Sequence, residues 1–172
     1  HGRDRRQRQM CIRDRFIKIP PGQARLVRAA CLLHDVSWRA HPDFRAEVCF
    51  EYATRANLGG LSHEERVFLG LALLHRYRNK RDGTRFRELF ELLSTNHQKD
   101  AEVLGKAMRL GAMLWANPDD ETAQLCWLPK KKSLLLTLTA QASPLFGEVA
   151  EARLHALAQA LNATTRVDMK LT

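Results

Sequence analysis

The order of apolar and polar residues divides the first two thirds of the chain into helical segments. Residues 22–36, GQARLVRAACLLHDV, bear apolar side chains over such a wide arc that they predict a largely buried helix. Pro42 is well placed as the first residue of a second helix, which extends over DFRAEVCFEYATRAN, residues 43–57, and ends before Gly59 and Gly60. The pattern therefore predicts two consecutive helices separated by a short break.

A third predicted helix should be central to the fold. Ser62 and Glu65 have the spacing of a capping box, in which a serine side chain and a glutamate side chain satisfy the first free N–H groups of a helix. The segment behind them, residues 64–78, is apolar on almost every side in its middle. The turn NKRDG then separates this helix from a short amphipathic helix over residues 84–94.

The last part of the chain changes its period. Thr95 and Gln98 are expected to cap a longer helix over residues 100–116. Residues 122–141 alternate leucine and tryptophan with polar side chains on both sides of a Pro-Lys-Lys-Lys turn, which is typical of a β-hairpin. A last amphipathic helix follows a Ser-Pro cap over residues 143–161. The predicted fold class is all-α, an orthogonal helical bundle with one small β-hairpin near the C-terminus.

The composition is that of a soluble globular protein, with 45% hydrophobic and 27% charged residues in a chain of 172. Its longest apolar runs fall far short of the ~20 residues that a membrane helix needs, so no membrane association is expected. The four cysteines are scattered without a CxxC pair, and Cys31 and Cys49 lie in apolar segments, as core thiols do in a reducing cytoplasm. We therefore expect a cytoplasmic protein with one domain over residues 19–172.

The net charge of +9 is concentrated at the N-terminus. Residues 1–18 hold seven Arg or Lys against two Asp and show neither helical nor strand periodicity. We interpret this segment as a basic arm that is disordered or not native, and a basic arm that docks on nucleic acid is the alternative. The rest of the chain is only mildly basic, so nucleic acid is not an expected partner.

An adjacent His34–Asp35 pair follows the apolar run of the first predicted helix, and such pairs form the core of the HD class of metal-dependent phosphohydrolases. The longer string AACLLHDVSWRAHPDFRAE, together with RANLGGLSHEERVFLGLALLHRYR, resembles the C-terminal helical domain of the exopolyphosphatase and guanosine pentaphosphate phosphohydrolase family. AMRLGAMLW and GEVAEARLHALAQAL extend the likeness, which covers roughly residues 19–165. The resemblance implies an HD-like helical bundle.

The resemblance also implies that the parent protein hydrolyses polyphosphate or guanosine pentaphosphate in N-terminal actin-like lobes that position magnesium. Nothing upstream of residue 19 has the strand–loop–helix pattern of a phosphate cradle. We therefore expect the chain to be a C-terminal portion with no catalytic residues and no cofactor of its own, the magnesium belonging to the missing lobes. Its expected partners are polyphosphate or guanosine pentaphosphate and a second copy of the chain in a homodimer.

A working HD metal site needs more than His34 and Asp35. It also needs an upstream histidine and a carboxylate from a later helix, because a divalent ion must be held at several positions while one stays open for water. The only upstream histidine is His1, and Gly111 stands where the later carboxylate would lie. We therefore expect no metal here, and a vestigial pair that is kept for its hydrogen bonds within the fold.

Basic residues near the break between the first two predicted helices, and at the end of the third, form a candidate phosphate site. If the first and third helices pack side by side, these residues line one rim, where guanidinium groups bind phosphates through paired hydrogen bonds. In the resembled family, the helical domain looks like one wall of a basic groove that guides the polyphosphate chain. Solvated charge is the alternative for each residue. The predicted phosphate-binding residues are Arg39, His41, Arg45, His75 and Arg76.

Three functions follow from these patterns. The leading hypothesis is a domain of an exopolyphosphatase-like phosphohydrolase that guides polyphosphate and supports dimerisation without catalysing hydrolysis. The first alternative is a stand-alone metal-dependent HD phosphohydrolase, in which His41 or His75 would complete the ligand set. The second alternative is a basic helical module that binds nucleic acid.

Overall fold

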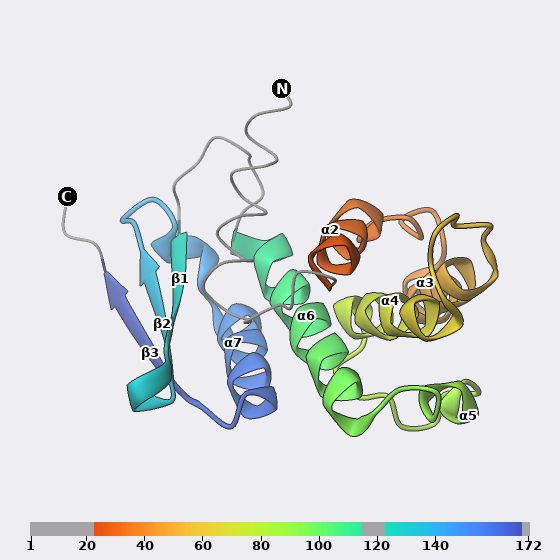
Figure 1. Cartoon of the computed structure of the whole chain (residues 1–172). Coiled ribbons are helices and arrows are strands. Elements are labelled where there is room, and N and C mark those ends of the chain that lie inside the picture. The colour runs from red at the N-terminus through yellow and green to blue at the C-terminus, as the bar shows by residue number, and fades with distance from the viewer. Residues whose placement is uncertain (1–22, 115–122, 170–172) are drawn as a thin grey trace. The chain divides into compact units, whose positions relative to one another are not determined.

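The computed structural model describes residues 23–114 and 123–169 (Figure 1). The described residues fall into two compact units, one over residues 23–109 and one from residue 110 onward. Most of the described elements are helices, which confirms the predicted fold class. The basic arm predicted over residues 1–18 lies outside the described residues, and the single domain over residues 19–172 stays a prediction.

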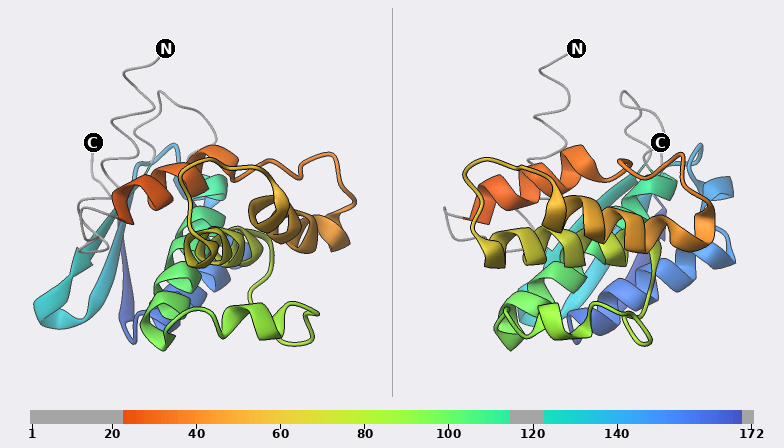
Figure 2. Two further views of the ribbon diagram at one scale, coloured as in Figure 1. Left: turned by 45° about the vertical axis from the view of Figure 1, so that its right-hand side comes forward. Right: turned by 90° about the vertical axis from the view of Figure 1, so that its right-hand side faces the viewer.

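The helical unit is built around α4. This helix carries nine consecutive buried residues, from Val67 to His75, so neighbours cover it on all sides, as its apolar sequence predicted. Figure 2 shows α3 and α4 lying side by side. The elements in chain order are α2 (Ala24–Leu33), η2 (Pro42–Phe44), α3 (Arg45–Arg55), α4 (His63–Tyr77), α5 (Arg87–Phe90) and α6 (Thr95–Leu114), the last five residues of which belong to the second unit.

Aromatic rings fill the space between α3 and α5. Phe50 of α3 is fully buried and stacks on Phe86, with 4.4 Å between ring centroids. Phe90 meets Phe50 edge-on at 5.5 Å. Offset and edge-on contacts of this kind add to the stabilisation that burial of the rings provides. This cluster holds the segment after α4 against the helical core.

The predicted start of α4 is confirmed, whereas the next two helices begin and end elsewhere. Ser62 accepts a hydrogen bond from the backbone of Glu65, whose side chain accepts one from the backbone of Ser62, which completes the capping box. The cap of α6 is Ser94 rather than Thr95, since the Ser94 hydroxyl accepts from His97 N at 3.2 Å.

The helix predicted over residues 84–94 shrinks to the four residues of α5. The side chain of Gln98 explains this difference. Its Nε2 donates to the carbonyl oxygens of Phe90, at 2.8 Å, and Leu93, at 3.0 Å. These are the carbonyls that a continuing helix would use for its own ladder, so the side chain of the next helix ends α5 early.

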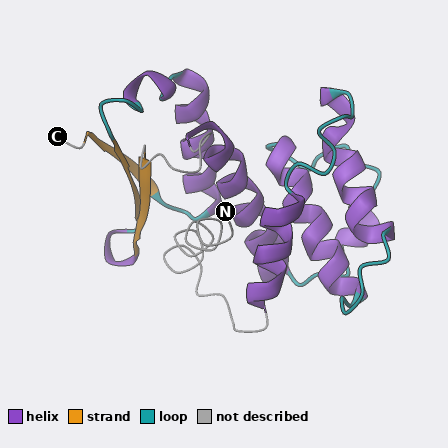
Figure 3. Cartoon of the chain, turned by 90° about the horizontal axis from the view of Figure 1, so that it is seen from above, coloured by secondary structure: helices purple, strands orange, loops and turns teal. Residues whose placement is uncertain are grey.

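The second unit contains the predicted hairpin and a strand that the pattern did not predict. The hairpin pairs antiparallel with Cys126 opposite Leu135, and Lys132 at its turn adopts φ +43°. Strand β3 then runs parallel to β2 and gives the sheet order β1-β2-β3. The strands are orange in Figure 3. The elements are β1 (Ala123–Leu128), η3 (Pro129–Lys131), β2 (Ser133–Leu138), η4 (Ser143–Leu145), α7 (Glu148–Ala160) and β3 (Thr164–Met169).

Helix α7 forms the crossover between the two parallel strands. Parallel neighbours need such a crossover, and a helix is its usual form. Leu154 and Leu157 are buried on α7, and Leu134, Leu136 and Leu138 are buried on β2. The Ser-Pro pair expected to cap this helix instead forms η4, and α7 begins behind Gly147. No helix in the described ranges is both long enough and apolar enough to cross a membrane.

Candidate functional site

His34 and Asp35 lie in the turns that follow α2. His34 Nδ1 is 2.8 Å from the carbonyl oxygen of Cys31, one turn earlier, to which a protonated Nδ1 donates. His34 Nε2 lies 3.5 Å from the carboxylate of Asp35, and both side chains are about half exposed. A hydrogen bond from His34 to the last turn of α2 therefore holds the pair in place.

Tyr77 and Arg76, at the end of α4, fasten the same pair from the other side. The Tyr77 hydroxyl is 3.1 Å from Asp35 Oδ1 and 2.9 Å from the carbonyl oxygen of His34, and its single hydrogen is shared between them. Arg76 Nη2 lies 3.6 Å from Asp35 Oδ1, and its guanidinium sits over the Tyr77 ring at 4.8 Å. We call His34, Asp35, Arg76 and Tyr77 the polar junction, since they join the ends of α2 and α4.

Arg76 and Tyr77 depend on these contacts more than Asp35 does, because their side chains are less accessible to water. The Arg76 side chain is only 12% exposed, whereas that of Asp35 is 58% exposed. Partial burial raises the pKa of the Tyr77 hydroxyl above its usual range, and the nearby Arg76 charge opposes that rise. Tyr77 therefore stays protonated and able to donate at any physiological pH. Asp35 supplies the acceptor for both groups.

The polar junction does not suit a divalent cation. Asp35 already accepts from Tyr77 and faces the positive charge of Arg76, which repels a second cation at the same carboxylate. His34 Nδ1 is occupied by the carbonyl of Cys31, which leaves only Nε2 as a possible ligand atom of this residue. Within residues 23–114 and 123–169, no group of three or more His, Cys, Asp or Glu side chains is placed to hold a metal ion. The chemistry available to the junction is hydrogen bonding within the fold.

Arg45 closes the turn between α2 and α3. Its Nε donates to the carbonyl oxygen of Ala40 at 3.0 Å, and its Nη2 donates to that of Trp38 at 2.9 Å. Ser37 is buried beneath this turn, where its hydroxyl donates to the carbonyl oxygen of Arg45 at 3.1 Å. The two bonds of Arg45 satisfy backbone carbonyls of the turn, and the bond of Ser37 ties the turn to the first residue of α3. Arg45 thus has a structural role besides the phosphate contact expected of it.

Arg39 and His41 lie exposed on that turn. The Arg39 guanidinium rests over the Trp38 ring at 5.0 Å, and no hydrogen bond or ion pair engages it among the described residues. His41 is 66% exposed, with its Nδ1 3.5 Å from the carboxylate of Asp43. We call Arg39, His41 and Arg45 the basic turn. It groups three of the five residues predicted to contact phosphate.

His75 differs from the expectation of a residue on the rim. It is 2% exposed, and neither ring nitrogen has a hydrogen-bond partner in the described part of the chain. Burial lowers its pKa to about 4, so the ring is neutral at physiological pH. Gly105 of α6 permits this packing, because a Cβ there would stand 2.4 Å from that of His75. An uncharged, enclosed imidazole is poorly placed to bind a phosphate chain.

Tyr77 is the residue of this region that sequence reasoning missed. The signal was present, since a tyrosine in the last turn of a central helix brings a polar hydroxyl to the end of an apolar core. The sequence pattern did not predict the partner of the Tyr77 hydroxyl, because Asp35 lies 42 positions earlier in the chain.

The chain was compared with known families and proteins. A family described as "Exopolyphosphatase, C-terminal" matches residues 17–167. No curated protein matches the chain. The matched range covers most of the sequence and includes the polar junction and the basic turn, and the chain therefore belongs to the exopolyphosphatase C-terminal domain family.

Proposed function

We propose that this domain binds the polyphosphate chain of an exopolyphosphatase at the basic turn and does not itself catalyse hydrolysis. One observation carries the proposal: in a member of this family, Arg39 and His41 lie exposed on a turn that Arg45 fixes from beneath. A guanidinium group that is held in place loses less conformational entropy when it binds a phosphate oxygen.

The pattern of partners supports a polyanionic ligand. Arg39 keeps its N–H donors available within the described residues, since its only close contact is the face of Trp38. Arg45 donates two hydrogen bonds to carbonyl oxygens, and the remaining N–H groups of its guanidinium are available to a ligand. Arg76 is neutralised by Asp35 and lies mostly inside, so we assign it a supporting part. Guanosine pentaphosphate is the other ligand that this surface would accept.

We also propose that the domain works within a homodimeric cytoplasmic protein whose magnesium belongs to other lobes. Cys31 and Cys49 are free thiols, which fits a reducing compartment. Leu145 is 46% exposed and Val149 is 58% exposed, near the start of the last helix, where contact with a second copy would cover apolar surface. The size of the protein in solution, measured by light scattering, tests the dimer.

Binding and hydrolysis are tested together on the purified chain. With magnesium present, we expect no phosphate release from polyphosphate. Long polyphosphate should bind, and its affinity should fall steeply as salt rises, because binding releases counterions from the chain. Arg39→Gln should weaken this binding about threefold or more, since it removes one charged contact. Arg28→Gln is the matched control, because it removes another exposed arginine, this one from α2.

Three results would contradict the proposal. Turnover by the chain alone would show that it is an enzyme. Stoichiometric manganese, iron or zinc that is lost in His34→Ala would favour the stand-alone phosphohydrolase. Binding that is equally weakened by Arg39→Gln and Arg28→Gln would reduce the basic turn to ordinary surface charge.

A further inference from the structure

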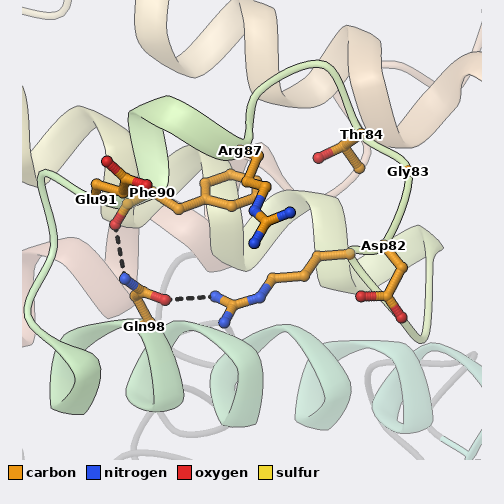
Figure 4. Close-up of a pocket in the computed structure, with 8 residues that line it drawn as sticks. Asp82, Gly83, Thr84, Arg87, Phe90, Glu91 and Gln98 are labelled. Atoms are coloured by element: carbon orange, nitrogen blue, oxygen red, sulfur yellow. Dashed lines mark hydrogen bonds between the residues drawn. The ribbon is translucent and has the colours of Figure 1, made fainter.

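A hollow of about 370 Å³ opens in the helical unit between the loop after α4, α5 and the first turns of α6. Figure 4 shows Arg87 reaching into it from α5, with Thr84 and Gly83 on the loop and Gln98 on α6. Gly83 adopts φ +74°, which lets the loop turn back at this point. None of these residues belongs to the basic turn or the polar junction.

The first wall of the hollow is an arginine that the fold holds in place. Arg81 Nη1 donates to Gln98 Oε1 at 2.6 Å, and its guanidinium lies 5.7 Å from the centroid of the Phe90 ring. The amide of Gln98 cannot flip, because its nitrogen already donates to the carbonyl oxygens of Phe90 and Leu93. Arg81 therefore presents its remaining N–H donors in a fixed orientation.

The second wall carries donors that no described residue uses. Thr84 is 8% exposed, and its hydroxyl has no hydrogen-bond partner in the described part of the chain. A buried hydroxyl without a partner costs about 1–3 kcal/mol, and a bound molecule that accepts its hydrogen bond would remove that cost. The Arg87 guanidinium has no hydrogen bond or carboxylate partner in the same ranges, and Figure 4 shows the Thr84 oxygen on the side facing Arg87.

The charges around the loop divide into two groups. Arg78 and Arg85 are matched by carboxylates of α3, with Arg85 Nη2 2.7 Å from Glu51 Oε1 and Arg78 Nη1 3.8 Å from Glu47 Oε1. In contrast, Lys80, Arg81 and Arg87 have no carboxylate within ion-pair distance among the described residues. The fold thus neutralises the cations that face α3 and leaves those at the hollow unmatched.

Two carboxylates also line the hollow, and they favour a phosphate group that still carries a hydrogen. Asp82 and Glu91 contribute to its lining and are exposed. A phosphate inside a chain carries a negative charge and no hydrogen, so these carboxylates would repel it. Orthophosphate keeps a P–O–H donor near neutral pH, because its third proton stays bound, and a carboxylate can accept that hydrogen. A terminal phosphoryl group, whose second pKa is near about 6, offers the same donor in its singly protonated form.

We propose that this hollow binds orthophosphate or the terminal phosphoryl group of a short phosphate chain. Arg81 and Arg87 bind the ionised oxygens, the Thr84 hydroxyl donates to one of them, and Asp82 or Glu91 accepts the P–O–H hydrogen. The site does not depend on polyphosphate binding at the basic turn, since the two share no residue.

Three phosphate probes test the proposal by calorimetry on the full chain at low salt. Orthophosphate and linear tripolyphosphate both offer a terminal group, whereas cyclic trimetaphosphate has none. We expect the first two to bind and the cyclic anion to bind at least about tenfold more weakly, the loss that one charged hydrogen bond brings. A preference for tripolyphosphate over orthophosphate would identify a chain end as the ligand, and the reverse would identify free phosphate.

Variants assign the binding to the hollow. Arg87→Gln should weaken orthophosphate binding about tenfold, and Thr84→Val, which keeps the side-chain shape, about threefold. Arg28→Gln should leave binding unchanged. Equal affinity for the cyclic and linear anions, wild-type affinity in Arg87→Gln, or no binding of either orthophosphate or tripolyphosphate would each overturn the proposal. Long-chain binding in Arg39→Gln is measured separately, so either site can fail without the other.

Discussion

The polar junction and the hollow after α4 differ in which of their polar groups have partners within the described residues. At the junction, Asp35 has Tyr77 and Arg76 as partners, and His34 has a carbonyl oxygen. At the hollow, the Thr84 hydroxyl is buried without a partner, and Arg87 has none among the described residues. Arg76 and Tyr77 of the junction and Thr84 and Arg87 of the hollow all lie within ten residues of the end of α4. Sequence proximity therefore does not decide whether a polar group is matched.

This contrast distinguishes polar groups that stabilise the fold from polar groups that are available to bind a ligand. Matched groups stabilise the fold, and removing one leaves its partner unsatisfied. Unmatched groups add little to the fold and keep their hydrogen bonds for another molecule. The His-Asp pair, which looks most like a catalytic motif in the sequence, belongs to the matched kind. The loop residues, which look like an ordinary charged turn, belong to the unmatched kind.

The largest expected effect concerns His75, which adjoins the junction and is buried without charge. Its pKa of about 4 lies below the usual value of about 6.5, so below pH 6.5 the unfolded chain takes up a proton that the folded chain refuses. The free energy of unfolding should therefore decrease as pH falls from about 6.5 to 4, by up to about 3 kcal/mol.

Urea unfolding at several pH values measures this effect. His75→Leu should remove most of this slope, whereas His63→Gln, at an exposed histidine, should keep it. An unchanged slope in His75→Leu would mean that another group governs acid sensitivity.

The next effect compares two carboxylates directly. Asp35→Ala should lower the free energy of unfolding by about 1.5 kcal/mol, because Tyr77 and the largely buried Arg76 lose their acceptor. Asp82→Ala, at a carboxylate with no partner in the described residues, should change it by less than about 0.5 kcal/mol. Chemical denaturation of both variants measures the two changes in the free energy of unfolding. Equal decreases in Asp35→Ala and Asp82→Ala would contradict the distinction between the two regions.

A smaller effect is expected from one hydroxyl. Tyr77→Phe keeps the ring under Arg76 and deletes the donor to Asp35 and to the carbonyl of His34, which should cost about 1 kcal/mol. Tyr52→Phe is the control, since the Tyr52 hydroxyl makes no hydrogen bond with the described residues. A Tyr77→Phe protein as stable as wild type would show that water replaces the hydroxyl at no cost.

The smallest effect on stability is expected at the hollow. Arg87→Gln should change the free energy of unfolding by less than about 0.5 kcal/mol, as surface substitutions without partners do. Orthophosphate should raise the melting temperature of the wild type more than that of Arg87→Gln, because a ligand that binds the folded state stabilises it, whereas the general salt effect of phosphate is common to both proteins. A marked loss of stability in Arg87→Gln without ligand would place Arg87 among the structural residues.

Much of the fold could be predicted because its signals are local. The capping box at Ser62 and Glu65 and the apolar sides of α4 depend on residues within a few turns of one another. Strand β3 escaped prediction because its partner β2 lies across the α7 crossover, and its residues alternate only weakly. The early end of α5 escaped because a side chain from the next helix takes its carbonyls.

The candidate site could be predicted only in part, for the same reason. The sequence marked Arg39, His41 and Arg45 as neighbours along the chain, and they do share one turn. It also marked His75, but burial depends on what packs around a residue, and Gly105 brings α6 close enough to enclose the imidazole. The hollow went unpredicted because its walls come from three segments, the loop after α4, α5 and the first turns of α6, which only the fold brings together.

The sequence by itself determined the order of the helices, the hairpin and membership of an exopolyphosphatase C-terminal family, since these follow from periodicity, caps and a long specific string. Only the tertiary structure decided which polar groups have partners. Hydrogen bonds and burial join residues such as Asp35 and Tyr77, 42 positions apart, and no local pattern encodes such a pairing. The three-dimensional fold gives the His34–Asp35 pair hydrogen-bond partners, whereas it leaves hydrogen-bond donors of the loop after α4 without partners among the described residues.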